Sequence, residues 1–137
     1  MKFLQLKFIP QSTDFALLLL RLVSGLTMII FHGWGKLANF GDLSSKFPDV
    51  IGIGSAPGLI LAILAEVVAA ALVAVGYLTR FAALVLSANM AVAFFIAHGA
   101  KLSGPGNGEL AFIYLAAYLV ILFAGSGRFA FEGNKGS

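Results

Sequence analysis

The chain contains no cysteine, and few of its residues are charged. Without cysteine it cannot form disulfides, thiolate metal sites, iron–sulfur ligation or a dithiol relay of its own. Only 11% of the 137 residues are charged, whereas soluble domains carry about 25%. Hydrophobic residues make up 60% and the mean hydropathy is +0.98, so the composition excludes an ordinary soluble domain and predicts a chain that lies in a bilayer.

Basic residues outnumber acidic ones, 9 to 6, but they are scattered next to apolar segments. This pattern favours contact with anionic lipid headgroups, and we expect no nucleic-acid partner. We also predict no metal site.

Four apolar segments predict a single all-α transmembrane domain, residues 1–137, folded as a four-helix bundle with up-down-up-down topology. The expected spans are 15–36, 57–77, 81–98 and 109–124. Each can cross a hydrocarbon core of about 30 Å, the last one only just. The longest connection, 39–56, carries several apolar residues and is expected to lie on the membrane face or to cap the bundle, with a lid as one interpretation.

The basic residues outside the span interiors predict cytoplasmic termini. An even number of spans places both termini on one side. The side of the termini then holds Lys2, Lys7, Arg80, Arg128 and Lys135. The opposite side holds Lys36, Lys46 and Lys101. The side with more basic residues is expected to be cytoplasmic.

Glu66 lies near the centre of the second span, where a carboxyl group is costly unless it faces the protein interior, a partner or water. A rise of about 1.5 Å per residue places His32 and His98 at a matching depth in the outer half. We therefore predict a polar cavity around His32, Glu66 and His98. The ligand-binding candidates are Arg21, His32, Lys36, Glu66, Asn89, His98, Glu109 and Tyr114, and no catalytic residue can be named.

Each candidate also has a purely structural interpretation. Arg21 and Lys36 could be anchors at the headgroups, and Asn89 could form an interhelical hydrogen bond. Glu109 could cap the fourth helix, and Tyr114 could be ordinary core. Either histidine alone could satisfy one backbone carbonyl.

Two motifs in the first span, Arg21-Leu-Val-Ser-Gly25 and Phe31-His-Gly-Trp-Gly-Lys-Leu37, resemble the DoxX family of small membrane proteins. The resemblance extends over residues 15–131. It includes Glu66, the turn 76–80, Ala97-His98, Glu109 and Gly125-Ser-Gly127. The resemblance implies a four-helix protein of the bacterial inner membrane that is linked to redox work. One branch is similar to the membrane subunit of a thiosulfate:quinone oxidoreductase. The family's polar positions would map onto Arg21, His32, Lys36, Glu66 and His98, while the cysteines of some relatives have no counterpart here.

The sequence leaves four functions open. We favour a subunit that binds a quinone, because imidazole can donate to quinone carbonyls and a desolvated Glu66 can exchange protons. Dinucleotide, haem-attachment and flavin motifs are absent, so electrons would come from a soluble redox partner. The alternatives are haem b between the two histidines, which nothing in the sequence demands, a non-enzymatic anchor for redox partners, and a small-molecule permease. Homo-oligomers also stay open.

Overall fold

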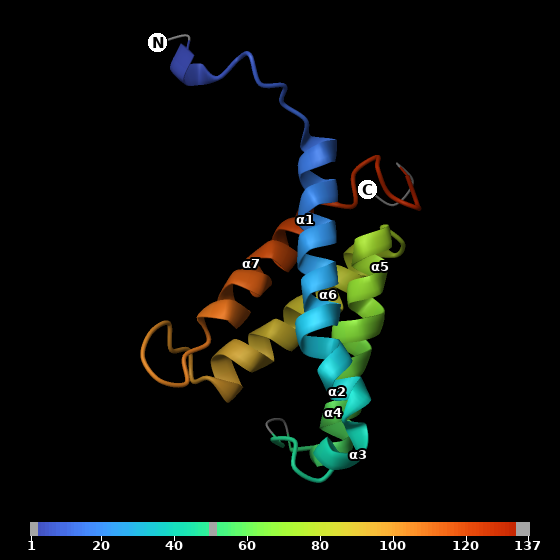
Figure 1. Ribbon diagram of the computed structural model, residues 1–137, viewed down its shortest axis with the longest axis vertical. Coiled ribbons are helices and arrows are strands. Elements are labelled where there is room, and N and C mark those ends of the chain that lie inside the picture. Colours follow the sequence, from blue (N-terminus) through green and yellow to red (C-terminus); the bar gives the residue numbers. More distant parts are fainter. Residues whose placement is uncertain (1–2, 50–51, 134–137) are drawn as a thin grey trace.

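The computed structural model describes residues 3–49 and 52–133, and these form helices joined by turns (Figure 1). The first long helix is continuous through α1 (Thr13–Met28), η2 (Ile29–Gly33) and α2 (Trp34–Ala38). The second comprises α4 (Ser55–Ile63), η3 (Leu64–Ala69) and α5 (Ala70–Val75). The third comprises α6 (Thr79–Ala91) and η4 (Val92–Ala97), and the fourth is α7 (Glu109–Ala124). Two short helices, η1 (Phe3–Gln5) and α3 (Phe40–Leu43), complete the described part.

The all-α class is confirmed, with helix bounds within about two residues of the predicted ones. Among the described residues, three helices are long and apolar enough to cross a membrane: Thr13–Ala38, Ser55–Val75 and Thr79–Ala97. The fourth, α7, is apolar but has only 16 residues. Lys2 and Lys135 of the charge count, and Val50 and Ile51 of the long connection, lie outside the described residues.

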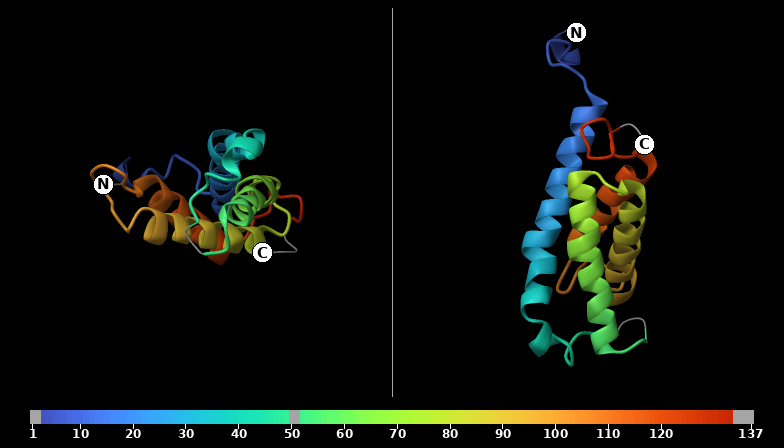
Figure 2. Two further views of the ribbon diagram at one scale, coloured as in Figure 1. Left: turned by 90° about the horizontal axis from the view of Figure 1, so that it is seen from below. Right: turned by 90° about the vertical axis from the view of Figure 1, so that its right-hand side faces the viewer.

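The helices pack as two pairs. In Figures 1 and 2, α1 lies beside α5, and α6 and α7 form a second pair that crosses the first obliquely. Gly25 permits the close approach within the first pair, because a Cβ atom there would lie 2.8 Å from the carbonyl oxygen of Ala70. The start of α1, the turn after α5 and residues 127–133 lie toward one end of the molecule, and α2, α3 and the start of α4 lie toward the other (Figure 1).

The distribution of side chains is inverted relative to a soluble protein. Phe31 and Phe123 are 74% and 79% exposed, whereas Arg21 and Glu66 are 1% and 5% exposed. In water this arrangement would expose apolar surface while burying charge. In a bilayer it is the expected one, since lipid solvates the apolar exterior and charged groups face the protein interior.

Tyr118 links α7 to α1 and gives a direct stability prediction. Its side chain is fully buried, and its hydroxyl donates to the carbonyl oxygen of Ser24 at 2.9 Å. Replacing Tyr118 with phenylalanine should lower the free energy of unfolding by about 1 kcal/mol, because a buried hydrogen bond is lost. Thermal unfolding in detergent measures the change. Tyr77→Phe is the control, since Tyr77 is 45% exposed in the turn after α5. Equal effects at both positions would contradict the assignment.

Candidate functional site

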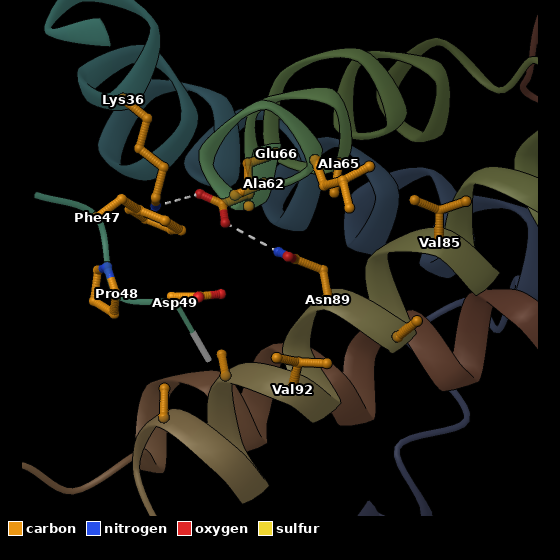
Figure 3. A pocket seen from close by; sticks show the side chains of 15 residues that line it. Lys36, Phe47, Pro48, Asp49, Ala62, Ala65, Glu66, Val85, Asn89 and Val92 are labelled. Atoms are coloured by element: carbon orange, nitrogen blue, oxygen red, sulfur yellow. Dashed lines mark hydrogen bonds and ion pairs between the residues drawn. The ribbon is translucent and has the colours of Figure 1, made fainter. Parts of the chain in front are cut away.

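Glu66 is held by two side chains from neighbouring helices (Figure 3). Its Oε1 atom accepts a hydrogen bond from Nζ of Lys36 at 2.6 Å, and its Oε2 atom accepts one from Nδ2 of Asn89 at 3.0 Å. We call Lys36, Glu66 and Asn89, from α2, η3 and α6, the polar triad. Because each carboxylate oxygen has a donor and Lys36 supplies a counter-charge, Glu66 can remain ionised inside the bundle. Asn89 thus forms the interhelical hydrogen bond that was one interpretation of this residue.

Gly33 brings the first two long helices together at this level. A Cβ atom at Gly33 would lie 2.6 Å from the carbonyl oxygen of Glu66 and 2.7 Å from Cγ2 of Val67. Only glycine therefore allows η2 to contact the backbone of η3 directly. Lys36 follows about one turn later, which places its ammonium group within reach of Glu66.

Each of the three long helices contains a π-helical segment, namely η2, η3 and η4. In η2 the backbone N–H of Trp34 donates to the carbonyl oxygen of Ile29, five residues back. In η4 the N–H of His98 donates to the carbonyl oxygen of Ala93, also five residues back, at 3.0 Å. Such segments widen the helix locally, shift the faces that follow, and are frequent at functional sites. Here η3 carries Glu66 itself.

The polar triad forms one wall of a cavity of about 420 Å³. The rest of the lining is mainly apolar and includes Leu61 of α4, Val85 of α6 and Val92 of η4. In Figure 3 the bonded Lys36, Glu66 and Asn89 lie above the open space and Val92 lies below it. A volume of a few hundred Å³ with a few convergent polar groups is typical of small-molecule sites.

The connection after α3 supplies another part of the lining through Phe47, Pro48 and Asp49. Asp49 also fixes the local backbone, because its Oδ1 atom accepts the N–H of Gly54 at 3.0 Å. The apolar residues of this connection predicted a capping role in general. They did not single out Phe47 and Pro48, because the path of an irregular segment cannot be read from periodicity.

Neither histidine lines this cavity. The ring of His32 packs edge-on against that of Tyr114, with 5.6 Å between centroids, and the Tyr114 hydroxyl donates to Oγ1 of Thr27 at 2.8 Å. Nδ1 of His98 lies 3.1 Å from the carbonyl oxygen of Gly106 in the connection before α7. The polar wall expected from His32, Glu66 and His98 is therefore built from Lys36, Glu66 and Asn89.

Arg21 and Glu109 lie away from the polar triad. Arg21 is buried and faces the bundle, where its Nη2 atom donates to the carbonyl oxygen of Phe129. Glu109 is exposed at the start of α7, and its backbone N–H is bonded by Oδ1 of Asn107 at 3.0 Å. The side-chain acceptor at this helix start thus comes from Asn107, a residue type known for bonding nearby backbone groups. In residues 3–49 and 52–133, no group of three or more His, Asp or Glu side chains is placed to hold a metal ion.

A DoxX profile matches residues 16–99, which is more than half of the chain and includes the whole polar triad. The chain belongs to the DoxX family. It is also similar to an uncharacterized protein of Haemophilus influenzae, with 34% identity over 116 residues that cover 79% of this chain and 81% of the relative. No solved structure matches it. The DoxX match ends before α7, so the resemblance at Glu109 and Gly125–Gly127 stays a prediction.

Proposed function

We propose that this DoxX protein binds a quinone in the cavity beside the polar triad and acts as the membrane subunit of a redox system. The supporting observation is the combination of an apolar cavity of about 420 Å³ with an ion pair, Lys36–Glu66, on its wall. A quinone ring needs an apolar slot, donors for its carbonyl oxygens and groups that exchange protons.

The polar triad can supply both kinds of group. An ammonium group has three N–H donors, so two on Lys36 remain for a ligand after one bonds to Glu66. The Glu66 carboxylate has lone pairs left to accept a hydrogen bond from a quinol hydroxyl. Reduction of a quinone consumes two electrons and two protons. In this proposal the two protons come from water and reach the quinone through Lys36 and Glu66, and a soluble partner delivers the two electrons.

The proposal places all four helices across the bacterial inner membrane in alternating directions, with both termini in the cytoplasm. Contacts at one end of the molecule support the shared side of the termini, because the N–H of Arg128 bonds to Oδ1 of Asp14 at 3.0 Å. Lys36 lies near the opposite end of the first long helix. The cavity then occupies the outer half of the bilayer, where Phe47 and Pro48 cover one side of it.

Binding of decylubiquinone to the purified protein in nanodiscs tests the proposal. Replacing Glu66 with glutamine removes the negative charge, and replacing Lys36 with methionine removes the ammonium donors. Each change should weaken binding at least tenfold, which corresponds to about 1.4 kcal/mol. Equilibrium dialysis with quantification of bound quinone gives the affinities.

Glu109→Gln is the matched control, because this exposed carboxylate at the start of α7 does not line the cavity. Its affinity should equal that of the unmodified protein. No saturable binding by the unmodified protein, or equal affinity in all variants, would refute the quinone site and favour the anchor for redox partners. Haem b is not proposed, since His32 and His98 have separate neighbours and neither lines the cavity.

A further inference from the structure

The environment of Arg21 is not explained by the cavity or its proposed ligand. Arg21 is 1% exposed, and one of its nitrogen atoms, Nη2, donates to the carbonyl oxygen of Phe129. Its Nε and Nη1 atoms are buried and have no hydrogen-bond partner within the described part of the chain. A buried cation is costly unless a counter-charge compensates it, so the group that neutralises Arg21 is a structural question.

The residues after α7 bring a carboxylate, that of Glu132, to the same end of the bundle as Arg21. Residues 127–133, here called the C-terminal strap, fold back over this end of the bundle (Figure 1). The N–H groups of Phe131 and Glu132 bond to the carbonyl oxygens of Val75 at 2.9 Å and Gly76 at 3.0 Å. Glu132 therefore lies next to Gly76, the residue that packs against the Arg21 guanidinium group, and the Oε2 atom of its carboxylate is buried without a hydrogen-bond partner among the residues described.

Gly76 shows how closely the strap and the guanidinium group pack. Its φ angle is +82°, and a Cβ atom there would collide with Cβ of Ala130 and with Nη1 of Arg21. The strap, the turn after α5 and the guanidinium group therefore form one packed unit. Arg21 contributes the charge that the strap covers.

Within residues 3–49 and 52–133, the strap buries few apolar side chains. Phe129 and Phe131 are 49% and 78% exposed, so they bury limited apolar surface. Among the described residues, its other connections include the backbone bonds from Arg128, Phe131 and Glu132 and the edge-on packing of the Phe131 ring against Tyr77. Segments with few buried apolar contacts open locally at lower free energy than the core.

We propose that the C-terminal strap is a latch, that is, a segment that closes over the folded helices and whose closed state is stabilised by the attraction between two charged groups. It opens as a unit while the helices stay folded, and the attraction between Arg21 and Glu132 sets how often it opens. This inference does not depend on the quinone site, because none of its residues lines the cavity.

Hydrogen exchange of the full-length protein in detergent tests the latch, read at the amides of positions 131 and 132. Replacing Glu132 with glutamine should raise their exchange rates about tenfold, because the negative charge that attracts the buried guanidinium group in this proposal is lost. Amides in the middle of α5 and α6 should exchange as before. Glu109→Gln, which removes an exposed carboxylate elsewhere, should leave the strap unchanged.

Arg21→Gln should have a similar effect on the strap, and the two substitutions together should have little more effect than either alone. Where Arg21→Gln does not fold, Arg21→Lys keeps the charge and should give protection between those of the unmodified protein and Glu132→Gln. Unchanged exchange in Glu132→Gln would overturn the latch. So would strap amides that exchange only together with those of α5 and α6.

Discussion

Replacing Glu66 with leucine is expected to lower the free energy of unfolding by about 3 kcal/mol, because the Lys36 ammonium group would keep its charge and lose its counter-ion. Lys36 is only 24% exposed and borders a mainly apolar cavity, so water cannot fully replace the carboxylate. Asn89 would lose its acceptor in the same step. Chemical unfolding in detergent, followed by circular dichroism, measures the change.

A double substitution separates the ion pair from simple packing. Lys36→Met combined with Glu66→Leu replaces both charges with apolar side chains, and such replacements of buried pairs are often neutral. The double variant should therefore recover most of the stability lost in Glu66→Leu, yet bind no decylubiquinone. If its loss instead equalled the sum of the two single losses, an unpaired lysine would not be the cause.

The second large effect is expected at Gly33. Alanine there would place its Cβ atom 2.6 Å from a backbone oxygen of Glu66, which cannot move without moving η3. We expect Gly33→Ala to cost about 1–3 kcal/mol, the usual range for overpacking. We also expect it to move Lys36 away from Glu66 and so to weaken quinone binding. Unfolding and dialysis measure the two effects.

Gly35 provides the matched control, two residues later in the same helix. A Cβ atom at Gly35 would have no neighbour within 4 Å. Gly35→Ala should therefore leave binding unchanged and stabilise the protein slightly, since alanine favours helix more than glycine. A Gly33→Ala variant that behaved like Gly35→Ala would show that the close contact of η2 and η3 is not required.

The helices could be predicted because length and apolarity decide them. A long apolar segment has few alternatives to a membrane helix, and the turns after Val75 and Ala124 contain glycine. Glu66 could also be predicted as a polar centre, since a carboxyl group within such a segment requires a partner. These inferences need only the local composition of the chain.

The partners of Glu66 could not be predicted in the same way. Depth along ideal α-helices put His32 and His98 in one layer, but π-helical segments in all three long helices shift the faces that follow them. Lys36, first interpreted as an anchor, has a side chain long enough to turn back toward Glu66. The close contact at Gly33 places Lys36 within reach of Glu66. This contact joins two helices that are separate in the sequence, so local composition does not reveal it.

The modest length of α7 has a consequence for the surrounding lipid. Its 16 residues rise about 24 Å, whereas a typical hydrocarbon core is about 30 Å thick. A crossing α7 therefore creates a hydrophobic mismatch on one flank of the protein. Acyl chains beside that helix must compress, while those beside the first helix need not. With the proposed four crossings, the protein would impose an uneven bilayer thickness around itself, and a thinner membrane would suit the α7 flank best.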